Sequence, residues 1–237
     1  FVTAKLGQRT DTSDADGEVV ETREVNVTRE QILEHKVALT GDIKQVPTMF
    51  SALKYQGQPL YKLARQGITV EREARPITVF KFELLRFEGD EADFEVHCSK
   101  GTYVRTLVDD LGQMLGCGAH VKVLRRTKVA GYPSEKMLTL EQIQALKDDN
   151  MDEQGTVDYA ELDAQLLPMQ TALQGLPEIE LPLKDVTTLR FGQQVETDKD
   201  DLAQAILFEK ESGDFAGTIV IEDGLIKVGR LVVKAAD

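Results

Sequence analysis

One run of residues, 99–112, most constrains how this chain can fold, because it joins a strand signal directly to a helix signal. Upstream of it, Phe94, Val96 and Cys98 alternate with polar neighbours, the period-2 pattern of a half-buried strand. Downstream, apolar residues recur at 3.6-residue spacing and form a helix stripe: Val104, Leu107, Val108, Leu111 and Leu115. Gly101 lies at the junction, where its permissive backbone allows a sharp turn. The run therefore predicts a strand, a tight turn and a helix in direct succession.

Two side chains at this junction are candidates for a binding site. Tyr103 and Arg105 fall in the first turn of the predicted helix, just beyond a strand end. Ligands often bind at such positions in proteins that combine helices and strands. The spacing alone leaves a second interpretation open, in which Tyr103 is a core aromatic and Arg105 is a solvated surface charge.

The charge distribution restricts which surface could meet a nucleic acid. The chain has 237 residues and a formal net charge of −13, which argues against general phosphate binding. Residues 99–128 nevertheless hold six Lys and Arg against two Asp, whereas residues 141–163 hold eight Asp and Glu and one Lys. This segregation favours one basic groove on an acidic body, although ordinary surface patchiness produces a similar pattern.

Composition also limits the class of protein. Only two cysteines occur, Cys98 and Cys117, and with no C-x-x-C pair they offer too few ligands for a structural zinc site. Lone cysteines are typical of a reducing compartment, so we expect a cytoplasmic protein. No apolar run approaches the roughly 20 residues that a membrane helix needs, and no leader resembles a signal peptide.

Residues 47–76 form a predicted excursion from the core, bracketed by Pro47 and Pro76. Pro59 is expected to open a short helix that Gly67 closes. Basic side chains alternate here with apolar and aromatic ones, and we expect three of them to contact RNA: Lys54, Lys62 and Arg65. A surface helical hairpin without a binding role is the simpler alternative.

Other segments carry recognisable signals. Strands are predicted at 1–6, 77–87, 92–99 and 119–130, the last carrying Leu124, Arg125 and Arg126. Capping boxes at Thr28-x-x-Gln31 and Thr139-x-x-Gln142 each predict a helix start, and the first of these helices is expected to run until Gly41. Short strands at 205–208, 218–221 and 225–233, with a turn at Asp223-Gly224, predict a small β-rich C-terminal domain.

Four motifs in this order resemble those of the TruB family, the bacterial stand-alone tRNA pseudouridine synthases. They are Gly7–Gly17, Pro47–Gly67, Ser99–Gly112 and Gly116–Arg126. The resemblance implies an α+β fold, with a mixed, largely antiparallel sheet, flanking helices and a small PUA-like C-terminal domain. It further implies a catalytic domain over 1–175, with an RNA-clamping thumb at 47–76, and a PUA-like domain over 176–237. The implied reaction isomerises uridine to pseudouridine at position 55 in the T loop of tRNA.

The resemblance also assigns roles to residues. Tyr103 and Leu124 are expected to bind the flipped uracil, and Arg105 to orient the nucleophilic aspartate through two-point hydrogen bonding, which lysine could not supply. Three further basic residues, outside the excursion, are also expected to contact RNA: Lys100, Arg125 and Arg126. The reaction requires no metal or organic cofactor. The expected partner is the T stem-loop of tRNA, with no membrane and no obligate protein partner.

One departure from the family is large. Its nucleophile lies in a G-(T/S)-L-D-P segment upstream of the first motif, and these 237 residues hold no such segment. Because the chain begins at Phe1, we expect a fragment that lacks the catalytic aspartate, is inactive alone and leaves Arg105 unpaired. Two alternatives stay open: a non-catalytic tRNA-binding or tRNA-folding module, and a guide-RNA-dependent relative. The long excursion favours the stand-alone type over the latter.

Overall fold

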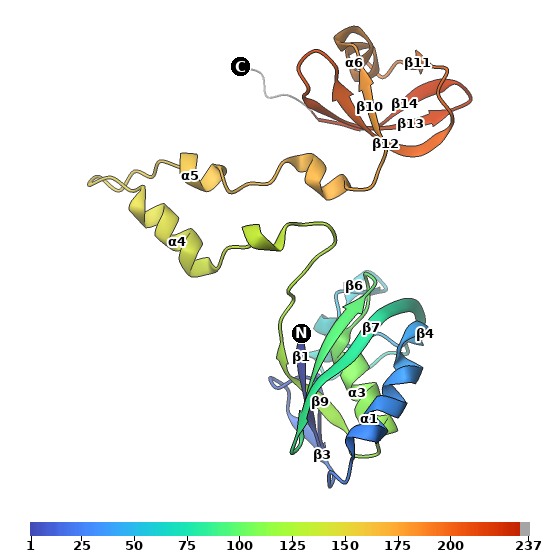
Figure 1. The fold of residues 1–237 in the computed structure, drawn as a ribbon, viewed down its shortest axis with the longest axis vertical. Helices are drawn as coiled ribbons and strands as arrows, with labels where there is room; N and C mark the ends of the chain where they lie inside the picture. Colours follow the sequence, from blue (N-terminus) through green and yellow to red (C-terminus); the bar gives the residue numbers. More distant parts are fainter. Residues whose placement is uncertain (233–237) are drawn as a thin grey trace. The chain divides into compact units, whose positions relative to one another are not determined.

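Alternating apolar side chains along five segments build the central sheet of the first unit, Phe1–Thr127, in the computed structural model, which describes residues 1–232 (Figure 1). The strand order is β4-β7-β8-β1-β9, and every neighbouring pair is antiparallel. The strands are β1 (Val2–Leu6), β4 (Gly41–Gln45), β7 (Arg75–Glu88), β8 (Glu91–Cys98) and β9 (Ala119–Leu124). The strands predicted at 1–6, 77–87 and 92–99 are therefore confirmed.

Two helices cover one face of this sheet and close the core. Helix α3 (Val104–Met114) buries Leu107, Val108 and Leu111 completely, and α1 (Arg29–His35) buries Ile32. These side chains pack in one apolar cluster with sheet residues such as Phe94. The helix predicted after residue 103 is thus confirmed, and its apolar stripe is what fixes the orientation of its polar first turn.

The predicted capping box at the start of α1 is present in both halves, since Thr28 and Gln31 each bond the other's backbone. The α-helix is shorter than expected, however. It ends at His35 and continues as the 3₁₀ turn η1 (Lys36–Leu39) before β4 begins at Gly41. The 3₁₀ turn tightens the chain so that Leu39 can be buried beside the sheet.

The excursion has a small core of its own. It contains the two-residue strands β5 (Lys54–Tyr55) and β6 (Gln58–Pro59), followed by α2 (Leu60–Ala64), which starts after Pro59 as predicted. Met49, Leu60 and Leu63 are buried together in a cluster separate from the main one. A second short hairpin, β2 (Gln8–Thr10) with β3 (Val19–Thr22), leaves the sheet directly after β1.

The long strand predicted over 119–130 is wrong beyond residue 124. Strand β9 pairs with β1, and the last register pair joins Leu124 to Val2. One further backbone bond runs from Arg125 N to Phe1 O. Arg125 and Arg126 lie beyond the strand, in irregular chain.

The second unit, which begins at Lys128, contains another five-stranded sheet. Its order is β10-β12-β13-β14-β11; β10 pairs in parallel with β12, and the other pairs are antiparallel. The elements of this unit are η2 (Ser134–Lys136), α4 (Leu140–Asp149), α5 (Ala160–Asp163), η3 (Met169–Leu173), β10 (Glu178–Leu181), α6 (Leu183–Arg190), β11 (Val195–Glu196), β12 (Leu202–Glu209), β13 (Phe215–Glu222) and β14 (Leu225–Leu231).

Several predictions for this unit are confirmed. The capping box of Thr139 and Gln142 starts α4, and Asp223-Gly224 makes the turn between β13 and β14 with positive φ at both residues. Residue 233, the expected end of the last strand, lies outside the described residues. Helix α6 was not predicted; its Val186 and Leu189 are buried against the sheet.

The expected division at residue 175 stays a prediction, because the compact units divide between Thr127 and Lys128. Residues 128–175 contain short helices and no buried side chain. Among residues 1–232, no helix combines the length and apolar character that crossing a membrane would demand.

Candidate active site

The first turn of α3 is fixed to the sheet through its backbone. Gly101 turns the chain with a φ of +85° after β8 ends. The buried side chain of Gln45, at the end of β4, then bonds both backbone groups of Tyr103: Tyr103 N donates to Oε1 at 2.9 Å, and Nε2 donates to Tyr103 O at 3.1 Å. A single amide thus sets where α3 begins. Arg105 lies two residues further along the helix, so its position follows from that of Tyr103.

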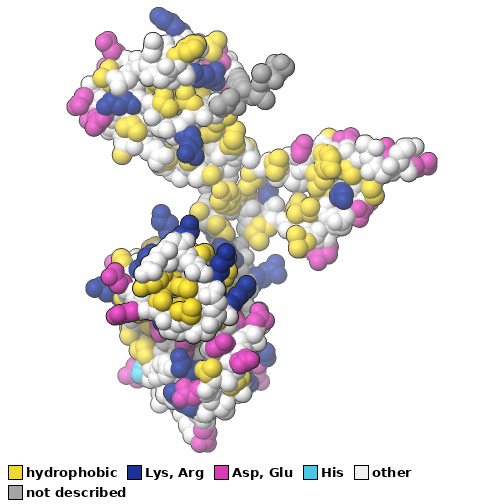
Figure 2. All heavy atoms as spheres, turned by 180° about the vertical axis from the view of Figure 1, so that it is seen from behind, with side chains coloured by type: hydrophobic (Ala, Val, Ile, Leu, Met, Phe, Trp, Pro, Cys, Tyr) yellow, Lys and Arg dark blue, Asp and Glu magenta, His cyan; other side chains and the backbone are white. Residues whose placement is uncertain are grey.

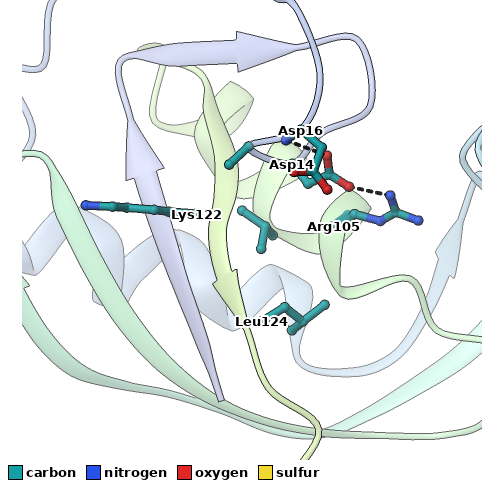
Figure 3. Close-up of a pocket in the computed structure, with 7 residues that line it drawn as sticks. Asp14, Asp16, Arg105, Lys122 and Leu124 are labelled. Carbon is teal, nitrogen blue, oxygen red and sulfur yellow. Dashed lines mark hydrogen bonds and ion pairs between the residues drawn. The ribbon is translucent and has the colours of Figure 1, made fainter.

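Arg105 is held between two loops that are distant in sequence. Its Nη1 donates to Asp14 Oδ2 at 2.5 Å, and its Nη2 donates to the carbonyl oxygen of Phe50 at 3.3 Å. Figure 3 shows the Asp14 carboxylate facing the guanidinium directly. The pair is mostly shielded from solvent, with side-chain exposures of 28% for Arg105 and 20% for Asp14. The guanidinium therefore ties the β2–β3 loop to the excursion.

This contact corrects the expectation that Arg105 lacks an anionic partner. Asp14 belongs to the polar loop between β2 and β3, and this loop folds back onto α3. Its backbone is fastened to β9, because Val121 N donates to Ser13 O at 3.0 Å. A buried cation would otherwise cost several kcal/mol of folding free energy, and the chain supplies the compensating charge itself.

The environment of Asp14 keeps its carboxyl ionised. Burial raises the pKa of this group, but hydrogen bonds from Thr12 Oγ1 at 2.6 Å and from Arg105 outweigh burial. The backbone N–H of Asp16 adds a bond at 3.2 Å. The net effect is a pKa below the ordinary value of an aspartate, so Asp14 carries a full negative charge at neutral pH.

A cavity of about 330 Å³ opens beside this pair. It is lined by Asp14, Ala15, Asp16, Arg105, Val121, Lys122 and Leu124. Leu124 is 51% exposed and offers an apolar surface below the guanidinium (Figure 3). The amine of Lys122 points away from Arg105 and pairs with Glu91 instead. The cavity thus combines a fixed cation, two carboxylates and a small apolar wall.

The structure brings together only some of the predicted site residues. Arg105 and Leu124 line the same cavity, whereas Tyr103 is half-buried next to it and does not belong to its lining. The six predicted RNA contacts are all exposed: Lys54, Lys62, Arg65, Lys100, Arg125 and Arg126. Arg65 also lies over the ring of Tyr61, 5.5 Å from its centre. On the face seen in Figure 2, Lys and Arg side chains gather on one part of the first unit, and acidic ones on another.

A second cavity, of about 480 Å³, lies between the β2–β3 hairpin, the excursion and α3. Arg9, Ser13, Met49, Arg72 and Asp109 are among its lining residues. Arg72 Nη1 donates to Pro47 O at 3.1 Å, which anchors the start of the excursion. The first cavity therefore depends on how the β2–β3 loop and β9 meet α3, and the second on how the hairpin and the excursion meet it.

Sequence reasoning missed Gln45 and the pairing of Asp14. A usable signal for Asp14 was the local sequence Thr12-Ser13-Asp14, in which short polar side chains favour tight self-bonded loops. Nothing in the sequence marked Gln45, since its partners are the backbone of a residue 58 positions away. Within the described 1–232, no three His, Cys, Asp or Glu side chains are grouped in a way that could hold a metal ion.

Two solved complexes share the fold of this chain. A solved H/ACA RNP bound to a substrate RNA containing 2′-deoxyuridine shares the fold, with a TM-score of 0.65 over 98% of this chain and 65% of the other, at 17% identity. A Cbf5–Nop10–Gar1 complex matches with a TM-score of 0.60 over 92% of this chain and 58% of the other, at 21% identity.

Comparison of sequences defines the family more closely. Residues 1–104 match the N-terminal domain of TruB family pseudouridylate synthase, and residues 105–174 match the tRNA pseudouridylate synthase B C-terminal domain. The chain belongs to the TruB family. A protein of Shewanella sp. strain MR-7 named tRNA pseudouridine synthase B is 53% identical over 237 residues, 98% of this chain and 74% of the relative. One from Vibrio cholerae with the same name is 58% identical over 82% of this chain and 62% of the relative.

The pairing of Asp14 makes a prediction about stability and pH. The folded-state pKa of Asp14 is lowered, so its contribution is present above the unfolded-state value of about 3.9 and is lost as the pH falls through the folded value. Asp14→Asn should therefore lower the unfolding free energy by about 1–3 kcal/mol at pH 7, and this difference should shrink below pH 4. Urea unfolding at pH 7, 5 and 3.5 measures it. Asp16→Asn, which alters an exposed carboxylate, serves as the control, and a difference that persists undiminished at pH 3.5 would contradict the assignment.

Proposed function

We propose that this chain takes part in the isomerisation of uridine to pseudouridine at position 55 in the T loop of tRNA. The observation that carries the proposal is Arg105, a guanidinium fixed by Asp14 and Phe50 at the rim of a cavity with an apolar wall. Relatives that are more than half identical to it over the aligned residues are named tRNA pseudouridine synthase B, which supports the same substrate class.

The reaction has four events. The N1–C1′ glycosidic bond breaks, the retained uracil turns, a C5–C1′ bond forms, and the proton on C5 leaves to solvent while N1 takes up a proton. The base must first leave its stack, which calls for an apolar surface and a basic groove along the displaced strand. Leu124 supplies the surface, and Tyr103 is proposed to meet the uracil when RNA is bound. The exposed cations of the excursion, with Lys100, Arg125 and Arg126, supply the groove.

Within this proposal, Arg105 orients a carboxylate nucleophile. Asp14 already occupies one side of the guanidinium, while Nη2 holds only a long bond of 3.3 Å to a carbonyl. Following the family resemblance, we assign the nucleophile to an aspartate of a G-(T/S)-L-D-P segment that these 237 residues do not hold. Asp14 then serves as the partner that holds the Arg105 guanidinium in place. No step of this scheme uses a metal or an organic cofactor.

The exposed basic residues proposed to contact RNA would serve equally in a second candidate function, a tRNA-binding module without catalysis. The two candidates differ in one measurable product. A synthase releases the hydrogen at uridine C5, whereas a binding module leaves it in place. Both share the same RNA-facing surface, so binding alone does not separate them.

A tritium-release assay separates these functions. The chain, incubated with tRNA carrying tritium at uridine C5, is expected to release no label above a control without protein. The same chain extended at its N-terminus by a segment with the G-(T/S)-L-D-P motif is expected to release it. Arg105→Lys in the extended protein should slow release by about 100-fold or more, since one lysine cannot replace two-point bonding.

Each arm has a contradicting result. Release by the unextended chain would overturn the assignment of the nucleophile, and Asp14→Asn would then show whether Asp14 is the reacting carboxylate. No release by the extended protein, with tRNA binding retained, would favour the binding module. The Shewanella relative serves as the positive control.

RNA binding by the excursion makes an independent prediction. Replacing Lys54, Lys62 and Arg65 together with alanine should weaken tRNA binding. It should also reduce the slope of log K against log salt, by about 0.9 for each phosphate that the protein no longer neutralises. Replacing Arg29, Lys36 and Lys44, three cations on α1, η1 and β4, removes the same charge and serves as the matched control. If the two triple variants have equal slopes, the excursion does not contact RNA.

A further inference from the structure

A second charge pair lies one helical turn along α3 from Arg105. Arg105 and Asp109 are four residues apart, so they project from the same side of the helix. The β2–β3 hairpin and its loop provide the opposite charges in Arg9 and Asp14. Arg105 on the helix pairs with Asp14 in the loop, and Arg9 on β2 pairs with Asp109 on the helix.

The Arg9–Asp109 pair has the geometry of a fixed fork. Arg9 Nε donates to Asp109 Oδ1 at 2.7 Å and Nη2 donates to Oδ2 at 3.0 Å. The arginine stem lies against Gly118, where a Cβ would come within 2.7 Å of Arg9 Cγ. Gly118 has a φ of +74°, so glycine is suited to this position for two reasons. The side chain of Arg9 is therefore held at its guanidinium by Asp109 and along its stem by Gly118.

Ser13 connects this pair to Asp14. Its backbone has a φ of +59°, a conformation that residues other than glycine rarely adopt. Three contacts hold it there: Ser13 N donates to Thr10 O at 3.2 Å, Ser13 O accepts from Val121 N at 3.0 Å, and Ser13 Oγ donates to Asp109 Oδ2 at 3.3 Å. Strained backbone of this kind persists where the surroundings fix it, and it is common at functional sites.

We propose that Arg9 and Asp109 are positioning residues, which hold Ser13 in its left-handed conformation and thereby place Asp14 against Arg105. Neither residue lines the cavity beside Arg105, so they act through the loop. The inference rests on the proposed function only in assigning a role to the Asp14–Arg105 pair. The placement of Asp14 by Arg9 and Asp109 is testable without RNA.

The test measures the pKa of the Asp14 carboxyl in the whole chain by carbon NMR. The charged side chains that the cavity places around this carboxyl are Arg105, Asp16 and Lys122. Asp109→Asn is the decisive variant, because two explanations predict opposite signs. Removing a nearby negative charge would lower the pKa of Asp14 through space. Loss of positioning would instead raise it by about one unit, since Asp14 loses its bond from Arg105.

Two further variants complete the design. Arg9→Gln should raise the pKa of Asp14 as much as Asp109→Asn does, and the double variant should raise it no further, because both changes open one contact. Arg23→Gln is the matched control: Arg23, like Arg9, pairs with Glu21, and it joins the chain after β3 to the C-terminal end of α3, at Gln113 and Gly116, without touching Ser13. It should leave the pKa of Asp14 unchanged.

The proposal is overturned if the pKa of Asp14 falls or stays constant in Asp109→Asn. An equal rise in Arg23→Gln would overturn it too, since that would indicate general loosening. Should Asp109→Asn fail to fold, Ser13→Ala decides, because it removes only the hydroxyl bond to Asp109. That variant is expected to raise the pKa by a smaller amount, and an unchanged value there rejects the proposal. None of these outcomes depends on whether the chain forms pseudouridine.

Discussion

The bond between Arg105 and Asp14 is the interaction on which the rest of the site depends. It joins the start of α3 to a loop that lies 91 residues earlier in the sequence. Because the pair is largely shielded from solvent, each charge requires the other: a lone buried guanidinium or carboxylate would lose hydration without compensation. The second guanidinium nitrogen of Arg105 donates to the carbonyl oxygen of Phe50, so the excursion is anchored to the same side chain. The Arg105 side chain thus connects the helix, the loop and the excursion.

The sheet and the helix supply the rigidity that this bond needs. Leu107, Val108 and Leu111 fix the rotation of α3 by full burial, and Gln45 fixes where the helix begins by bonding both backbone groups of Tyr103. The polar first turn then points away from the core. This arrangement allows a charged site to sit on a stable scaffold, while the excursion keeps a separate small core around Met49 and Leu60.

Local patterns in the sequence predicted much of this fold and less of the site. Strand β8 alternates more buried and more exposed side chains, α3 has a full apolar stripe, and both capping boxes form, since all of these signals act over a few residues. The end of β9 at Leu124 was not predicted, because the extent of β9 depends on pairing with β1, a segment distant in the sequence. Helix α6 was missed because its apolar side chains, Val186 and Leu189, make only a short stripe. Arg105 was identified from its place at the junction, but its contact with Asp14 requires the loop to fold onto α3, and no local pattern encodes that.

The central claim is that Asp14 and Arg105 stabilise one another specifically, and a double-mutant cycle tests it most directly. Asp14→Asn, Arg105→Gln and the double variant are compared by urea unfolding at pH 7. The account predicts a coupling free energy of about 1–3 kcal/mol, because either single change leaves a partly buried charge without its partner. Additive effects of the two substitutions, with a coupling near zero, would show that the two residues are neighbours without a shared role and would contradict the account.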